Sequence, residues 1–260
     1  MITRSKFNQT LKKIFSQDLL DQARKKDQHM PNGLQVPGNP EINHIVTGVS
    51  ISAELINQAM SRGADTLIVH HGLNLDSPYQ LLLPAQAARL KLLFEYEMNL
   101  YGYHYVLDAH PQLGNNAQLA KALKAKTKEP YFDGWGFIAK LSKPIKLSTL
   151  SEKLKKVVDH DVFVVEAIRE MKVQTLGIVS GGGVPRNKEL LEIQEKQIDV
   201  HLTGEIKESS LYQFLELGVG YIAAGHYATE TLGIKALTKK LQQELKGKVK
   251  VEFVEVSNPL

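Results

Sequence analysis

The stretch that decides the fold is INHIVTGVSISAELINQAMSRGADTLIVHHG, residues 42–72. Its two ends, 42–51 and 64–72, are short runs of aliphatic and β-branched residues, which are typical of buried strands. The segment between them has apolar residues at helical spacing, with Ser52 as a candidate N-cap and Gly63 at its end. The stretch therefore predicts a strand, a helix and a second strand, which is the repeating unit of α/β proteins.

The same alternation continues along the rest of the chain and predicts two α/β halves. A breaker-rich segment, TKEPYFDGW at 127–135, is the best candidate for a boundary, so we expect domains at 1–128 and 129–260. Further strands are expected at 99–108, 136–141, 162–168, 174–180, 199–204, 220–226 and 248–256. Further helices are expected at 84–98, 115–126, 148–159, 185–196, 205–218 and 231–246.

The composition narrows the classes of function that the chain can have. Of 260 residues, 43% are hydrophobic and 23% are charged, which is typical of a soluble globular protein. We expect a cytoplasmic protein without membrane contact, because no signal-peptide core and no membrane-length apolar run are present. The net charge of +4 comes with scattered lysines, which favours solvated helix faces over a nucleic-acid surface.

Cysteine is absent, whereas nine histidines are present. Disulfides and thiolate chemistry are therefore excluded, and any bound metal must be held by nitrogen and oxygen donors.

Polar side chains directly follow several of the predicted strands, at the edge where functional groups collect in α/β sheets. His70 and His71 end one strand, and adjacent strand residues point to opposite faces. They therefore suit two neighbouring metals, one ligand beside a structural histidine, or a simple packed pair. Asp108 ends the strand predicted at 99–108 and shares a face with His104, so it is either a ligand or a turn aspartate.

The stretch GHYATE, residues 225–230, places His226 and Glu230 four residues apart at the start of a helix. This spacing puts both side chains on one helical face, as in metal sites and also in ordinary surface helices. Together the chain offers three histidines, one aspartate and one glutamate. Five ligands suit two ions with a bridging carboxylate or water better than one catalytic ion with an open position.

Short blocks along the chain look like those of one known family. They are PNGLQV (31–36), ADTLIVHHG (64–72), YGYHYVLDAHPQLGNNAQLA (101–120), SGGG (180–183), HLTGEI (201–206) and AAGHYATETLGIKAL (223–237). The chain resembles, almost from end to end, the NGG-one-interacting-factor-three-like family. Its members are also called GTP cyclohydrolase I type 2 homologues or dinuclear metal centre proteins.

The resemblance implies a fold, an assembly and a ligand set. The fold is two α/β domains with mixed sheets flanked by helices and a dinuclear metal site between the domains. The assembly is a toroidal homohexamer. Two divalent ions per subunit, of iron, zinc or manganese, are implied, with the ligands His70, His71, Asp108, His226 and Glu230. Gly72 departs from the proline that many relatives have, and the middle of the chain is too short for the domain inserted in some of them.

Several other residues are candidates for roles around such a centre. His104 is a proton shuttle or orients a ligand, and Glu205 is an acid/base group, an orienting group or a first-turn helix glutamate. The loop SGGGVPRN at 180–187 forms either a tight turn or a phosphate contact through Gly182, Gly183 and Arg186. Trp135 and Tyr227 either stack on a base or pack in the core.

These residues predict a metal-dependent hydrolase that uses a metal-activated water on a small, nucleotide-like substrate. Glu230 is the predicted bridging ligand, because a carboxylate can span two ions. The alternatives are a non-catalytic protein that binds or delivers metal and, less favoured, a ring-shaped nucleic-acid binder.

Overall fold

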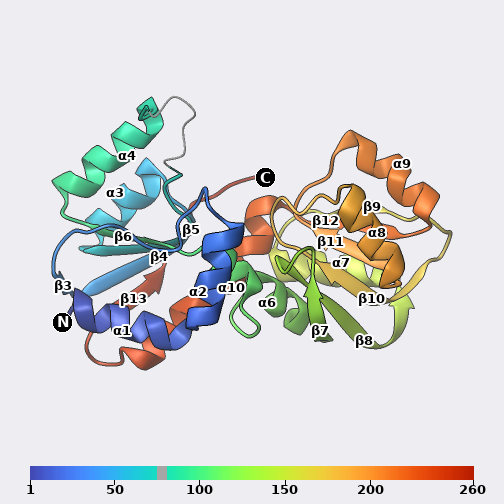
Figure 1. Cartoon of the computed structure of the whole chain (residues 1–260), viewed down its shortest axis with the longest axis horizontal. Coiled ribbons are helices and arrows are strands. Elements are labelled where there is room, and N and C mark those ends of the chain that lie inside the picture. The colour runs from blue at the N-terminus through green and yellow to red at the C-terminus, as the bar shows by residue number, and fades with distance from the viewer. Residues whose placement is uncertain (75–80) are drawn as a thin grey trace. The chain divides into compact units, whose positions relative to one another are not determined.

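The structure, a computed structural model, describes residues 1–74 and 81–260 and has two compact units, each with its own mixed sheet (Figure 1). The first unit comprises Met1–His110 and Ile234–Ser257, and the second comprises Pro111–Gly233 and Asn258–Leu260. The prediction of an α/β protein with two mixed sheets flanked by helices is confirmed.

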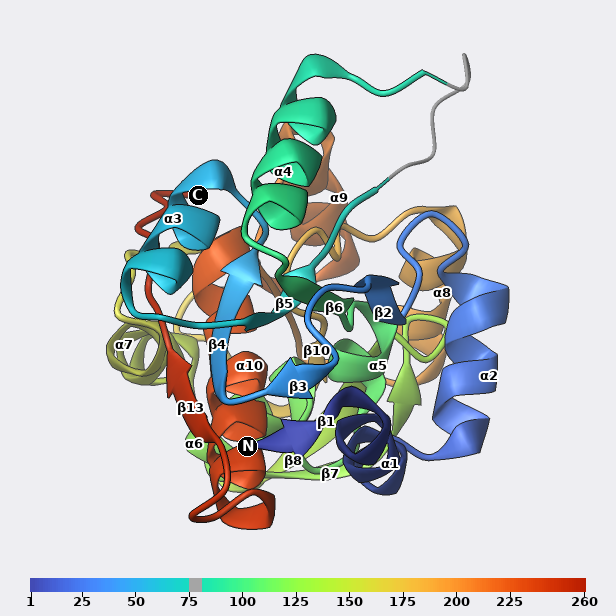
Figure 2. The same cartoon turned by 90° about the vertical axis from the view of Figure 1, so that its left-hand side faces the viewer.

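The sheet of the first unit has five strands in the order β13-β4-β5-β6-β2. Four strands run parallel and β2 pairs antiparallel with β6. In Figure 2 this sheet crosses the view, with β13 beside β4. The bounds of these strands are β2 (Gly33–Val36), β4 (His44–Ser50), β5 (Thr66–His71), β6 (Asn99–Gly102) and β13 (Lys250–Phe253); β1 (Ile2–Thr3) and β3 (Glu41–Ile42) form a separate pair.

Helices cover both faces of this sheet, with α3 and α4 on one face and α1 and α10 on the other (Figure 1). The helix predicted after Ser52 forms as α3, and the Ser52 hydroxyl accepts the amide N–H of Leu55 at 3.0 Å. On the opposite face the hydroxyls of Thr47 and Thr238 lie 2.6 Å apart, joining β4 to α10. The helix bounds are α1 (Arg4–Ile14), α2 (Gln17–Lys26), α3 (Ala53–Ser61), α4 (Pro84–Glu95), α5 (Tyr105–Ala109) and α10 (His226–Glu244).

The sheet of the second unit has six strands in the order β7-β8-β10-β11-β12-β9. Apolar residues of α6 and α7 form one core against this sheet, and those of α8 and α9 form another. The strand bounds are β7 (Ala125–Tyr131), β8 (Gly136–Lys146), β9 (Phe163–Val165), β10 (Lys172–Ile178), β11 (Val200–Thr203) and β12 (Gly220–Ala223). The helix bounds are α6 (Asn115–Ala122), α7 (Leu147–Val158), α8 (Asn187–Glu195) and α9 (Glu208–Leu217).

The structure corrects two local predictions. The strand expected at 99–108 ends at Gly102, and Asp108 lies in the short helix α5 instead of at a strand end. The segment 127–135 supplies part of β7, which pairs with β8, because its β-branched and aromatic residues outweigh its breakers. Asn116 is buried inside α6, as part of the helix predicted at 115–126, and its side chain accepts the amide N–H of Ser180 at 2.6 Å.

The compact units do not follow a single cut at residue 128. The first unit stops at His110, and the chain returns to it at Ile234 through the second part of α10 and strand β13. Pairing of β13 with β4 depends on partners about 200 residues apart, which local patterns do not encode. Among the described residues, no helix is long and apolar enough to cross a membrane.

Candidate metal centre

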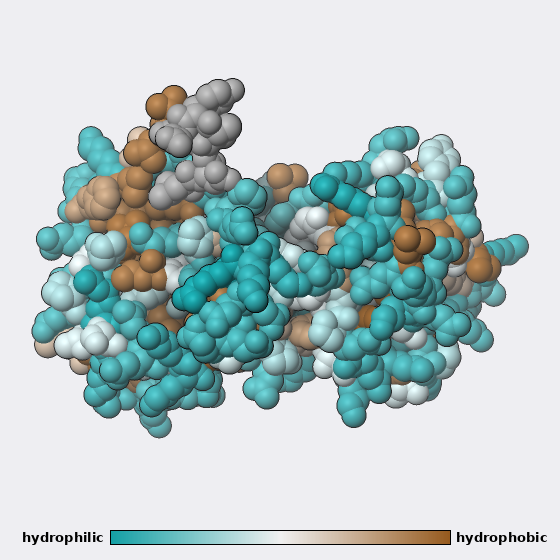
Figure 3. All heavy atoms as spheres, in the orientation of Figure 1, coloured by the Kyte–Doolittle hydropathy of each residue, from teal (hydrophilic) through white to brown (hydrophobic). Residues whose placement is uncertain are grey.

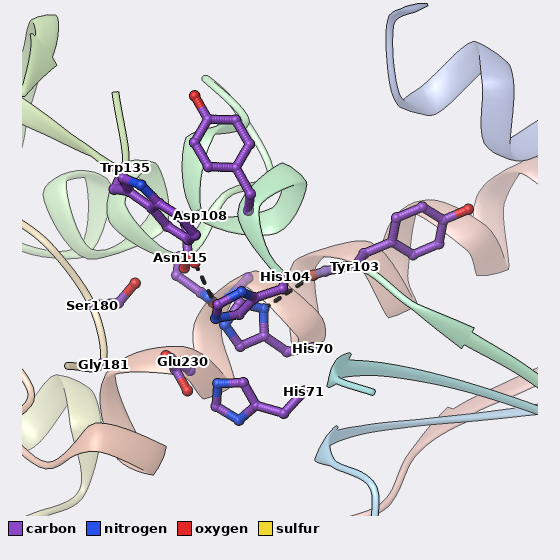
Figure 4. A network of polar contacts seen from close by, with 12 residues as sticks. His70, His71, Tyr103, His104, Asp108, Asn115, Trp135, Ser180, Gly181 and Glu230 are labelled. Atoms are coloured by element: carbon purple, nitrogen blue, oxygen red, sulfur yellow. Dashed lines mark hydrogen bonds and ion pairs between the residues drawn. The ribbon is translucent and has the colours of Figure 1, made fainter. Parts of the chain in front are cut away.

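In the first unit, strand β5 delivers two histidines to one cluster. His70 is fully buried and His71 is half-buried, and their ring centroids are 4.5 Å apart although the residues are neighbours. The His104 ring completes the group at 4.9 Å from His70 and 5.3 Å from His71 (Figure 4). One potential ligand atom from each of the three side chains lies within 4.8 Å of the others, which is compact enough to hold a metal ion.

The end of β5 has little room for further side-chain atoms. A Cβ at Gly72 would lie 2.2 Å from Oε1 of Gln35, and that same oxygen accepts the amide N–H of Leu73 at 2.8 Å. A larger residue at position 72 would therefore require the Gln35 side chain to move, whereas the backbone of Gly72 is not in the left-handed region.

Each of the three rings is held through Nδ1. His70 donates from Nδ1 to the carbonyl oxygen of Tyr103 at 3.1 Å, and His71 Nδ1 lies 2.9 Å from the Ser50 hydroxyl. Nδ1 of His104 donates to Oδ2 of Asp27 at 3.0 Å. A ring fixed in this way presents Nε2 as its metal-binding nitrogen, as in many known metal sites.

Asp108 brings a carboxylate to the same cluster. It is buried in α5, and its Oδ2 lies 3.6 Å from Nε2 of His70. Because α5 begins directly after His104, the turn from β6 into this helix positions both side chains. The structure therefore brings together His70, His71, His104 and Asp108 within the first unit.

Asp27 is a residue of this site that the sequence does not reveal. Its buried carboxylate accepts hydrogen bonds from His104 Nδ1, from the amide N–H of Tyr105 at 3.1 Å and from the Asn32 side chain at 3.0 Å. Burial raises the pKa of Asp27, but these bonds and the charge of His104 outweigh it and leave the pKa below its usual value. The only nearby signal is its place just before the PNGLQV block.

In the second unit, His226 lies between two carboxylates. Its Nδ1 is 2.6 Å from Oε1 of Glu205, and its Nε2 is 3.3 Å from Oε1 of Glu230. His226 begins α10, so Glu230 follows one helical turn later, as the four-residue spacing predicted. Glu205 precedes α9 and lies outside its first turn, which removes the helix-dipole interpretation of this residue.

The charges around His226 favour a cation. Burial lowers the pKa of His226, but hydrogen bonds and charges from Glu230 and Glu205 outweigh it and raise the pKa to about 9. The imidazole of His226 and the carboxylate of Glu230, which is 2% exposed, are donors that iron, zinc and manganese accept. The group of His70, His71 and His104 in the first unit therefore fits a divalent metal, and His226 and Glu230 add two potential ligands in the second unit.

The glycine-rich loop packs directly against these donors. A Cβ at Gly181 would lie 2.1 Å from Oε1 of Glu230 and 3.1 Å from Nε2 of His226, and its φ is +64°. The Gly181 amide N–H donates to Thr229 Oγ1 at 2.9 Å, and its carbonyl oxygen accepts from Thr203 Oγ1 at 3.0 Å. This loop therefore fixes the position of the two donors on α10.

The remaining candidates lie in or near this loop. A Cβ at Gly182 would meet nothing closer than 3.6 Å, and the carbonyl oxygen of Gly183 accepts from His201 at 2.8 Å. Arg186 is exposed at the start of α8, and the phosphate contact considered for this trio stays a prediction. Tyr227 is buried and Trp135 packs partly against a core, which agrees with packing roles.

The fold and these clusters define a class: α/β proteins with two mixed sheets whose grouped histidine, aspartate and glutamate side chains are compatible with metal binding. The family model described as Duf34/NIF3 (NGG1p interacting factor 3) matches residues 4–259, so the chain belongs to that family.

Named relatives and solved structures agree with this membership. A Haemophilus influenzae protein named GTP cyclohydrolase 1 type 2 homolog is 37% identical over 259 residues, covering 97% of this chain and 99% of its own. The solved structure of protein ybgI, described as of unknown function, covers both chains fully at 31% identity with a TM-score of 0.86. The crystal structure of TTHA1606 from Thermus thermophilus also covers both chains fully, at 28% identity and a TM-score of 0.83.

Proposed function

We propose that this protein is a metal-dependent hydrolase with two divalent metal ions of iron, zinc or manganese. The ligands are His70, His71, Asp108, His226 and Glu230, and the substrate is nucleotide-like. One observation carries the proposal: every histidine of the two clusters, including His104, is held through Nδ1 by an oxygen of the same unit.

This pattern is typical of imidazoles arranged for a metal. Metal-binding histidines usually donate this N–H to a carbonyl or carboxylate oxygen, which leaves Nε2 for the metal. In the packed histidine His201, by contrast, both ring nitrogens are hydrogen-bonded within the core. Three kinds of oxygen do this here, a carbonyl, a hydroxyl and two carboxylates, so the pattern does not come from one repeated motif.

The carboxylates complete the ligand sets. Asp108 and Glu230 are 5% and 2% exposed, and burying an ionised carboxylate is costly without a neighbouring cation. Because a carboxylate can bind two ions at once and an imidazole ordinarily binds one, Glu230 is the proposed bridging ligand.

Divalent ions in such a site would act as Lewis acids and lower the pKa of water towards neutrality. The chain's own part is to orient donors and to move a proton. Asp27 fixes the tautomer of His104 by accepting its Nδ1–H, so Nε2 of His104 takes up and returns the proton. Glu205 fixes His226 in the same way.

The substrate class and the assembly rest on relatives and on one surface feature. A relative's name, GTP cyclohydrolase 1 type 2 homolog, supports a GTP-like substrate, although a fold alone does not define a substrate. The proposed assembly is a toroidal homohexamer in the cytoplasm. Helix α4 supports an assembly, because Figure 3 shows apolar surface over this helix, and Leu83 and Phe94 at its ends are 54% and 63% exposed.

The test is metal content and turnover of the purified full-length protein, with His70→Ala as the ligand variant. His44→Ala is the matched control, because His44 is a buried histidine of the same sheet that pairs with Glu252 outside the cluster. We expect about two metal ions per chain, GTP ring opening detected as formate, and loss of both in His70→Ala only.

Two results would count against the proposal. Turnover that persists after the metal is removed would exclude metal-dependent catalysis. Bound metal without any turnover of nucleotides would favour the alternative, a non-catalytic protein that stores or delivers metal.

A further inference from the structure

The second unit has a cavity of about 560 Å³ that reaches the metal-binding side chains. His226 and Glu205 form part of its wall. Clefts of this size commonly bind small molecules, with mostly apolar walls and a few polar groups that set the orientation. A molecule in this cavity would lie against one of the proposed metal ligands.

Most of the cavity wall is apolar. Strand β9 and the segment before it contribute Val162 and Phe163, and other parts of the second unit contribute Ile206, Ala223, Pro259 and Leu260. Phe163 is 52% exposed, which is unusual for a large aromatic side chain at the start of a strand. An exposed ring beside a cavity offers a flat face on which another planar ring can stack.

The wall offers hydrogen-bond acceptors and has few groups that could bind an anion. Among the described residues that line the cavity, the carboxylate side chains are Asp161 and Glu205, the imidazoles are His160 and His226, and none is lysine or arginine. His226 lies between Glu205 and Glu230, so these two carboxylates already balance its charge. Lys155 neutralises Asp161 through an ion pair of 2.5 Å. One oxygen of Glu205 contacts His226, and a carboxylate has about four acceptor positions, so Glu205 can accept further N–H groups.

We propose that this cavity binds the ring of a planar, uncharged nitrogen heterocycle, which stacks on Phe163 and donates N–H groups to Glu205. The phosphates of a nucleotide would lie outside the cavity, because its wall has no lysine or arginine and its His226 is already paired with two carboxylates. The inference rests on the proposed function, since it assigns this site to the ring part of the same substrate.

The test is calorimetric binding of guanosine and of ribose 5-phosphate to the full-length protein, both as isolated and after metal removal. Guanosine is a neutral ring with N–H donors, and ribose 5-phosphate carries only the sugar and the anion. We expect guanosine to bind in both preparations and ribose 5-phosphate not to bind to the metal-free protein.

Two variants test the cavity itself. Phe163→Ala removes the stacking face and should weaken the binding of guanosine about tenfold. This loss is in the lower range for a lost base–aromatic stack. Ile206→Trp should fill the cavity and abolish binding. Tyr212→Ala is the control, because Tyr212 is a 60%-exposed aromatic side chain of α9 that does not line the cavity.

The results separate this inference from the proposed function. Guanosine binding that depends on Phe163, in a protein without turnover, supports the cavity and contradicts the hydrolase. Turnover without such binding contradicts the cavity alone. Equal affinities in Phe163→Ala and Tyr212→Ala, or tighter binding of ribose 5-phosphate than of guanosine, would overturn the inference.

Discussion

Asp27 and His104 form a pair of the kind that enzymes use to fix the tautomer of a histidine. The carboxylate is 7% exposed and also accepts the amide N–H of Tyr105, so the pair is attached to the start of α5. That helix also carries Asp108. One buried carboxylate thus positions His104, the proposed proton-transfer group, beside a proposed metal ligand.

We predict that Asp27→Asn lowers hydrolytic turnover by roughly a hundredfold, a loss typical of impaired acid–base catalysis, while the bound metal stays unchanged. An asparagine keeps the size of the side chain, but its amide cannot stabilise a protonated His104 as a carboxylate does. The measurement is the rate of GTP turnover alongside elemental analysis.

The control for this variant is Asp18→Asn, because Asp18 lies on α2 of the same unit and contacts Gln22. If the Asp27→Asn variant turns over GTP as fast as the Asp18→Asn variant, the proposed role of Asp27 is wrong.

At the scale of elements, the loop after β10 determines where the donors of α10 lie. Gly181 packs so closely against Glu230 that any side chain there would displace the carboxylate. Its positive φ adds strain for every other residue. The local sequence SGGG predicts either a tight turn or a phosphate contact, and in the structure the amide N–H and the carbonyl oxygen of Gly181 hydrogen-bond to α10 and β11.

We predict that Gly181→Ala lowers metal affinity by about 10- to 100-fold, as changes around metal ligands often do. Gly182→Ala is the matched control for metal content, because its new Cβ would meet nothing closer than 3.6 Å. Competition with a chelator measures both affinities. Equal affinities in the two variants would show that the contact with Glu230 is unimportant.

At the scale of the whole molecule, a buried histidine of the second sheet makes the free energy of unfolding depend on pH. His201 on β11 donates from Nε2 to the carbonyl oxygen of Gly183, and Nδ1 accepts from the hydroxyl of Tyr131 at 3.0 Å. Burial lowers the pKa of His201 to about 4, against the raising effect of the bond to Gly183. The folded protein therefore keeps this ring neutral below pH 6.

We predict that the free energy of unfolding falls by about 3 kcal/mol as the pH drops from about 6.5 to 4. In this window the unfolded chain protonates His201 and the folded chain does not, so protons favour unfolding. Urea denaturation at several pH values measures the slope. His201→Leu should remove this contribution to the change of unfolding free energy with pH, even if the variant is less stable at every pH. An unchanged pH dependence in the variant would contradict the prediction.

The sequence predicts much of this molecule, for clear physical reasons. Strand and helix periods and the caps at Ser52 and Gly63 are local, so the first strand–helix–strand unit forms as expected. The Asp27 contact and the pairing of β13 join residues far apart in the chain, and a local pattern cannot show them. The prediction of Asp108 on a strand is wrong because the turn at Tyr103 and His104 has no glycine or proline of its own to mark it.

Strand β13 has a consequence for how the chain is made. It occupies an edge of the first sheet, yet it comes from residues 250–253, after the whole second unit apart from its last three residues. During synthesis on the ribosome, the second unit can fold while the first still lacks its edge strand and leaves β4 open to other chains. The first unit is therefore completed only after almost all of the second unit has been translated.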